Sequence, residues 1–121
     1  PAKILDAVSE IVIETFAKSE ADVKDGMDIA LCSWNKKTNT LEYVGANNSL
    51  YLIRNGELIE TKADKQPIGK SLIKHPFTNH IIEIQKNDII YWKGHVAICI
   101  NSSDSLSTLE VASSRISILG L

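Results

Sequence analysis

The dipeptide Asn55-Gly56 places the tightest local constraint on how this chain can fold. It lies between two short segments rich in strand-forming residues, 49–54 (SLYLIR) and 57–62 (ELIETK). Asn-Gly is favoured in the two-residue turn that joins antiparallel strands, because both of its residues adopt positive φ angles readily. The sequence therefore predicts a β-hairpin centred on this dipeptide.

The first strand of this hairpin is apolar on both faces. Leu50 and Leu52 alternate with Tyr51 and Ile53, and successive side chains of a strand point to opposite sides of the sheet. Such a strand is expected to be covered on both sides, by a second sheet and by helices. We therefore expect an α+β fold of stacked layers rather than a single open sheet.

Other segments predict one helix and further strands. At residues 1–21, apolar residues recur at three- and four-residue steps and form one helical face. These residues are Ile4, Leu5, Val8, Ile11, Val12 and Phe16. The further strands are predicted at 27–34, 41–46, 77–85 and 89–92, with a hairpin loop at 35–40. The last two are expected to pair with each other through the turn Lys86-Asn87-Asp88.

Length and composition limit the function classes. With 121 residues the chain can form one domain with a modest core. Its formal charge is −2 with acids and bases interspersed, so it lacks the basic stripe that a nucleic-acid partner requires. No apolar stretch is long enough to span a bilayer, and the N-terminus lacks the layout of a signal peptide. We therefore expect a cytoplasmic domain without a membrane partner.

Both cysteines lie in apolar runs, Cys32 in IALCSW and Cys99 in VAICIN. Free cysteine is among the most buried residue types, so two buried reduced thiols are expected. A single disulfide between them is the alternative, although no pattern of a secreted disulfide scaffold supports it.

The common catalytic and metal-binding motifs do not occur in this sequence. It contains no Cys-x-x-Cys, His-Glu-x-x-His or Gly-x-Gly-x-x-Gly. Its histidines, His75, His80 and His95, lack the spacing of metal ligands and are interpreted as surface or turn residues. The remaining candidates are carboxylates at turns and strand ends: Asp25, Asp28, Asp64 and Asp88. They are either ordinary turn formers or, if they converge at one rim, ligands for Mg²⁺ or Mn²⁺.

The chain resembles the middle of the SpoIIE-like protein serine phosphatases, the bacterial branch of the PP2C superfamily. Three segments carry the resemblance in the same order and spacing: DGMDIAL (25–31), LEYVGANNSLYLIRNGEL (41–58) and KADKQPIG (62–69). The segment FTNHIIEIQKNDIIY (77–91) continues it, and residues 1–92 are interpreted as the family-like part of one domain.

This resemblance implies a PP2C-like α-β-β-α sandwich of mainly antiparallel strands, and metal-dependent dephosphorylation of phosphoserine or phosphothreonine. In the family, two Mn²⁺ or Mg²⁺ ions held by Asp residues share a bridging water that attacks phosphorus. Paired metals lower the pKa of that water and neutralise the phosphoryl charge. The implied partner is a phosphorylated anti-sigma-factor antagonist. The resemblance also implies that the phosphatase domain is attached to a sensor domain in a longer signalling protein.

The resemblance also assigns residues to the rim of the family's cleft. The segment 45–48 (GANN) stands where the broader PP2C enzymes have a Gly-Asp turn near the metals, and 64–67 (DKQP) is similar to their Asp-His-Lys-Pro loop. The rim residues implied are Asp25, Asp28, Asn47, Asn48 and Asp64. The alternative is that residues 45–48 form a bulge and turn without metal contact.

Two departures from the family pattern argue against catalysis by this chain alone. The family's first metal motif, Asp followed by Gly-His-Gly, lies upstream of the helix, so we expect a chain that is incomplete at its N-terminus. Where the family has Asp-Gly after the strand 89–92, this chain has Lys93-Gly94, and an ammonium group cannot ligate a cation. No residue therefore matches a primary metal ligand or a catalytic residue.

Residues 93–121 diverge from the family, with one apolar run, a serine-rich segment and a weakly helical end. Two interpretations stay open: an out-of-frame tail, which resequencing would reveal, or true divergence in which VAICI (96–100) adds a strand to the sheet.

Three functions follow from these observations. The first is a SpoIIE-type serine/threonine phosphatase domain that is inactive as this chain alone. The second is a non-catalytic relative that binds a phosphoprotein or another partner. The third is a structural β-rich domain with no link to phosphate.

Overall fold

The structure is a computed structural model that describes residues 1–18, 26–70, 75–92, 97–101, 109–112 and 116–118. Its first part comprises α1 (Ala2–Ala17), β1 (Ile29–Asn35), β2 (Thr40–Ala46), β3 (Leu50–Arg54) and β4 (Glu57–Thr61). Its second part comprises β5 (His80–Glu83), β6 (Ile89–Trp92), β7 (Ala97–Asn101), β8 (Leu109–Ala112) and β9 (Ile116–Ile118). The predicted α+β class is confirmed.

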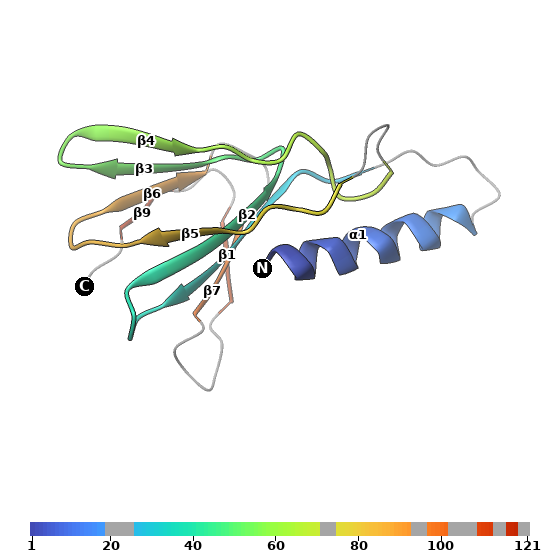
Figure 1. Ribbon diagram of the computed structural model, residues 1–121, viewed down its shortest axis with the longest axis horizontal. Coiled ribbons are helices and arrows are strands. Elements are labelled where there is room, and N and C mark those ends of the chain that lie inside the picture. The colour runs from blue at the N-terminus through green and yellow to red at the C-terminus, as the bar shows by residue number, and fades with distance from the viewer. Residues whose placement is uncertain (19–25, 71–74, 93–96, 102–108, 113–115, 119–121) are drawn as a thin grey trace.

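The strands form two sheets (Figure 1). One has the order β5-β2-β1-β7-β8 and the other the order β4-β3-β6-β9. Pairing is antiparallel throughout β5-β2-β1 and β4-β3-β6, whereas β7 joins β1 in parallel. The hairpin at Asn55-Gly56 is confirmed: their φ angles are 52° and 76°, and Arg54 pairs with Glu57 directly across the turn.

The side chains of β1 and β2 point alternately to the two faces of their sheet, and each face belongs to a different layer of the core. One set faces the second sheet and packs with its apolar residues; the buried members are Ala30, Cys32, Leu41, Tyr43, Leu50, Leu52, Ile84, Ile90 and Trp92. The other set faces α1; this layer buries Ala2, Leu5, Ile29, Leu31, Val44, Ala46, Ile68 and Phe77. The chain thus forms three layers: the helix, the five-stranded sheet and the four-stranded sheet. Cys32 is buried, as expected.

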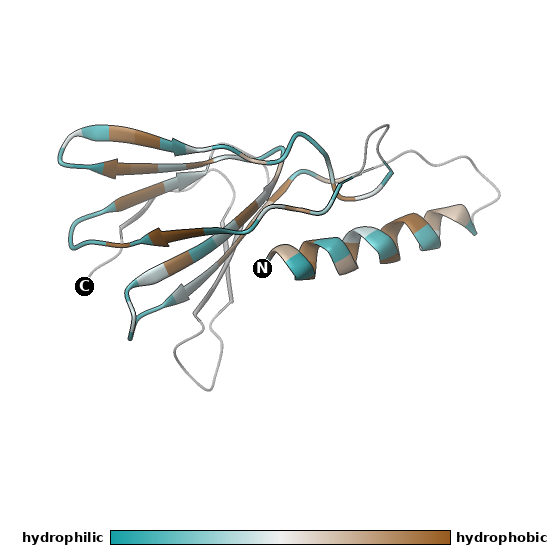
Figure 2. Cartoon of the chain, viewed as in Figure 1, coloured by the Kyte–Doolittle hydropathy of each residue, from teal (hydrophilic) through white to brown (hydrophobic). Residues whose placement is uncertain are grey.

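The predicted apolar face of the helix is partly wrong. Leu5 is buried and Val8 and Val12 pack against the core, but Ile4 and Ile11 are 52% and 62% exposed. Apolar residues recur along the whole of α1 (Figure 2), so the sequence pattern alone did not identify which stripe meets the sheet. The stripe in contact is narrower than the hydrophobic pattern and includes the buried hydroxyl residue Ser9.

The expectation that helices cover the outer face of β3 is also not met within the described residues. Leu50 and Leu52 are buried between the sheets, whereas Tyr51 and Ile53 are half-buried on the other face. There Tyr51 packs beside Tyr91 of β6, with the ring centroids 5.8 Å apart. Cross-strand aromatic packing therefore provides part of the cover that was expected from a helix.

The prediction that segments 77–85 and 89–92 pair with each other is wrong. β5 pairs with β2 in one sheet, and β6 pairs with β3 in the other. The connection is a corner between sheets rather than a hairpin turn. The carboxylate of Asp88 holds this corner by accepting hydrogen bonds from the backbone N–H of Gln85 and from the guanidinium of Arg54.

The end of the chain is extended rather than weakly helical where the structure describes it. β7 lies beside β1, as expected for VAICI under true divergence, and β8 and β9 extend the two sheets. The segment of β9, Ile-Ser-Ile, alternates β-branched and polar residues, which favours a strand.

Candidate functional site

The segments that carry the family resemblance meet where β1 begins and β2 ends. Residues 64–68 lie against both strands, with bridges from Met27 to Ile68 and from Ala46 to Asp64. The Met27–Ile68 bridge has backbone hydrogen bonds of 3.0 and 2.8 Å. The turn after β2 and the loop after β4 are therefore neighbours at one end of the five-stranded sheet.

Asp28 and Asn47 form the first contact at this end. Asp28 directly precedes β1 and Asn47 directly follows β2, and the antiparallel register brings them together. Asn47 Nδ2 donates a hydrogen bond of 2.9 Å to Asp28 Oδ1, and both residues are exposed. The φ angle of Asn47 is 56°, in the left-handed region that Asn tolerates better than most residues.

Asp64 forms the second contact and orders the loop. Its carbonyl oxygen accepts a hydrogen bond of 2.9 Å from the N–H of Asn47, and its own N–H donates one of 3.0 Å to Gly45. Its carboxylate accepts hydrogen bonds from the N–H and the Oγ1 of Thr78, at 2.8 and 2.9 Å. We refer to Asp28, Asn47 and Asp64 as the rim.

Tyr43 and Asn48 lie beneath the rim. The Tyr43 hydroxyl donates a hydrogen bond of 2.5 Å to the backbone carbonyl of Asn48, and both residues are buried. Burial raises the pKa of the Tyr43 hydroxyl well above its usual range, and the nearby Cys32 and Asp64 add to this effect. Tyr43 is therefore a neutral packing and hydrogen-bonding group rather than a general base at neutral pH.

The rim assignments have three different outcomes. Asp28, Asn47 and Asp64 converge, although they are distant in sequence. Asn48 is only 1% exposed and lies below the rim rather than on it. Asp25 lies outside the described residues.

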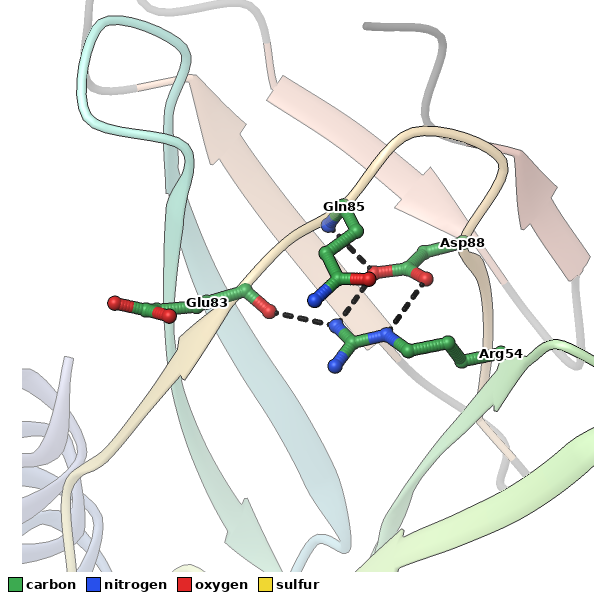
Figure 3. Close-up of polar contacts among 4 residues, drawn as sticks. All are labelled: Arg54, Glu83, Gln85 and Asp88. Carbon is green, nitrogen blue, oxygen red and sulfur yellow. Dashed lines mark hydrogen bonds and ion pairs between the residues drawn. The ribbon is translucent and has the colours of Figure 1, made fainter.

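Asp88, the fourth carboxylate considered, belongs to the corner between the sheets (Figure 3). It is 1% exposed and its two carboxylate oxygens accept from Arg54 Nε and Nη2 at 3.0 and 2.8 Å. The hydrogen bond from Arg54 lowers the pKa of Asp88 below its usual value, while burial acts in the opposite direction. Arg54 Nη2 also donates to the carbonyl of Glu83, so the residue joins β3 to the ends of β5 and β6.

The histidines lie elsewhere. His75 is exposed, as predicted, but His80 begins β5, is half-buried and stacks on the ring of Tyr43 at 5.7 Å between centroids. His80 is therefore a partly exposed strand residue rather than a turn residue, and its ring meets Tyr43 because β5 pairs with β2 in the same sheet. His95 lies outside the described residues.

Sequence reasoning missed a pocket of about 370 Å³ that is lined by Asp6, Glu10, His75 and Pro76. The buried side chain of Gln66 positions its outer wall by donating to the carbonyl of His75 at 2.6 Å. Asp6 accepts the N–H of Phe77 at 2.9 Å and fixes the same wall to α1. No local signal could reveal this pocket, because helix and wall are far apart in the sequence.

Within the described residues, the rim is not accompanied by the further ligands that the two-metal centre of the resembled family would need. The described part of the chain contains no group of three or more His, Cys, Asp or Glu side chains placed to hold a metal ion. The rim supplies two carboxylates, and each already accepts a hydrogen bond from a protein donor. Its observed role is to hold the ends of two strands and one loop together.

Comparison with protein-family models, curated proteins and solved structures finds no match for this chain. Among the described residues, no helix combines the length and the apolar character needed to cross a membrane.

Proposed function

We propose that this chain is a SpoIIE-type, PP2C-like domain from the class that dephosphorylates a phosphoserine or phosphothreonine regulatory protein, and that it does not hydrolyse phosphate by itself. The observation that supports the proposal is the convergence of Asp28, Asn47 and Asp64. Each comes from a different segment that resembles the family, and each was assigned to the rim on that ground. The expected partner is a phosphorylated anti-sigma-factor antagonist. The domain itself is expected to belong to a cytoplasmic signalling protein.

The layer order is consistent with this proposal. A helix, a sheet and a second sheet follow one another, as the first three layers of an α-β-β-α sandwich would. The fourth layer, a helix on the outer face of the β4-β3-β6-β9 sheet, is part of the proposal.

Lack of turnover follows from the chemistry of the rim. Asp28 and Asp64 are anionic acceptors, and a phosphate group brought against them without a cation would be repelled. Neither Asp can act as an anion-binding donor, and Asn47 Nδ2 already donates to Asp28. The rim therefore lacks the positive charge that phosphoryl transfer requires.

A second candidate, a non-catalytic partner-binding relative, is favoured by the same lack of a metal-binding group among the described residues. The carboxylates of the rim indicate which kind of partner such a relative would bind. They disfavour a phosphorylated partner and favour a neutral or basic protein surface, because like charges repel at short range.

Thermal unfolding with and without millimolar Mn²⁺, followed by release of phosphate from a phosphoserine peptide, tests both proposals. A domain without a metal site shows no rise in Tm and no turnover, since a ligand stabilises only the state that binds it. The matched control is Asp28→Asn, which removes one rim carboxylate. A rise in Tm with turnover that this variant abolishes would contradict the proposed inactivity.

Binding then separates the candidates. The proposed SpoIIE-type domain predicts that a phosphorylated antagonist binds at least as tightly as its unphosphorylated form. A partner-binding module with this carboxylate rim predicts preference for the unphosphorylated form. Failure to bind either form would favour a structural domain with no link to phosphate.

A further inference from the structure

The outer edge of β4 is a second surface that the rim does not involve. Within the described part of the chain, β4 is the last strand of the β4-β3-β6-β9 sheet, and Glu57 to Glu60 are all exposed. Leu58 and Ile59 are 63% and 44% exposed, and Figure 2 shows this hydrophobic middle of β4 at the sheet edge. The strand has an apolar centre between Glu57 and Glu60, and the unpaired backbone groups of such an edge are a template for pairing with another strand.

The hairpin fixes which backbone groups face outward. The two-residue turn at Asn55-Gly56 makes Arg54 and Glu57 a hydrogen-bonded pair. Along an antiparallel pair of strands, hydrogen-bonded pairs alternate with non-hydrogen-bonded pairs. Glu57, Ile59 and Thr61 therefore direct their N–H and C=O groups toward β3. Leu58 and Glu60 direct theirs away from the sheet, where they can bond to another strand.

We propose that β4 pairs with β4 of a second copy of this chain in an antiparallel, two-fold symmetric arrangement. In the register centred on Ile59, each Leu58 pairs with the partner's Glu60 and exchanges backbone hydrogen bonds with it. Ile59 then lies directly opposite the partner's Ile59. Glu57 lies opposite the partner's Thr61, so no two like charges face each other, and the two four-stranded sheets become one continuous sheet.

Self-complementarity selects this register and this partner. Moving the axis to Glu60 would place two glutamates opposite each other, which destabilises a strand pair. Moving it to Leu58 would place Glu60 opposite the turn residue Gly56 and remove hydrogen bonds of the ladder. The edge of β5 also carries an exposed isoleucine, Ile81 at 69%, and so provides a matched control site on a different sheet.

The interface is small, because one pair of short strands buries less than the roughly 1,200–2,000 Å² of stable complexes. A reversible dimer is therefore expected. Sedimentation of the purified chain over rising concentration should show a shift from 13.3 kDa toward twice that mass. Ile59→Lys should hold the chain at the monomer mass, since it places two ammonium groups on the axis, whereas Ile81→Lys should sediment like the wild type.

Cross-linking tests the register itself. Ile59 occupies a non-hydrogen-bonded site of the proposed pair, where Cα atoms about 4.5 Å apart fall within the range that a disulfide spans. With a copper oxidant, Ile59→Cys should give a covalent dimer, and Ile81→Cys and the wild type should not. A wild-type chain that stays monomeric up to about 1 mM, a folded Ile59→Lys variant that still dimerises, or cross-linking of Ile81→Cys alone would overturn the proposal.

Discussion

Gly45 is the residue at which packing beneath the rim leaves no room for a side chain. A Cβ there would overlap the Tyr43 hydroxyl, the carbonyl of Asn48 and the side chain of Ala63. The glycine of the GANN segment is therefore explained by close approach of a tyrosine, without reference to any metal. The same tyrosine fixes the backbone of Asn48 and so the direction in which the chain leaves β2.

Gly45→Ala is expected to lower the free energy of unfolding by about 2 kcal/mol, because overpacking forces its neighbours to shift. Chemical denaturation measures this loss. Gly56→Ala is the matched control: nothing lies within 4 Å of its added Cβ, so its cost comes only from the positive φ angle of 76°. A smaller loss for Gly45→Ala than for Gly56→Ala would contradict the packing explanation.

The Arg54–Asp88 pair makes stability depend on pH in a defined direction. The pKa of Asp88 is lowered from its ordinary 3.8 in the folded chain. The stabilising contribution is therefore fully present above that ordinary value and is lost as the pH falls through the lower folded value. Asp88→Asn removes it at every pH.

We expect Asp88→Asn to lower the free energy of unfolding by about 2 kcal/mol at pH 7, within the range for hydrogen bonds to charged groups. The difference from the wild type should stay constant from neutral pH down to about pH 5 and shrink below pH 3.8. Urea denaturation at a series of pH values measures the difference. A gap that widens toward acid would show that Asp88 is not the anionic partner described.

At the scale of elements, α1 is held by a narrow contact stripe. Leu5 is 2% exposed and packs on β1 and β2, while Ile11 is 62% exposed on a different side. The buried Ser9 also accepts the N–H of Gly69 at 3.1 Å, which ties the helix to the loop after β4. Burial rather than hydrophobicity should therefore decide which substitutions matter.

Leu5→Ala is expected to cost about 3 kcal/mol of unfolding free energy, as for other large-to-small changes in a core. Ile11→Ala should change it by less than about 0.5 kcal/mol, because the side chain is exposed. Parallel denaturation curves of the two variants compare them directly. Equal losses would mean that the opposite side of α1 also packs against the chain.

At the scale of the whole molecule, local sequence signals predicted the helix and the strands better than they predicted which strands pair with each other. Asn55-Gly56 predicted its hairpin correctly because both strands and the turn lie within a few residues. The pairing of β5 with β2 was not predictable from 77–92, since a two-sheet corner and a hairpin use similar turn residues. The family resemblance predicted that Asp28, Asn47 and Asp64 belong to one rim. Only the strand register and the backbone bridges show that they are neighbours.

The corner between β5 and β6 has a consequence for the order of folding. The hairpins β1–β2 and β3–β4 close short loops, whereas β2–β5 and β3–β6 join distant segments, whose loop closure costs more entropy. The sheets should therefore come together late, and the Arg54–Asp88 bond should form after the rate-limiting step. Stopped-flow measurements on Asp88→Asn should then show faster unfolding at a nearly unchanged refolding rate; slowed refolding instead would place this corner in the folding nucleus.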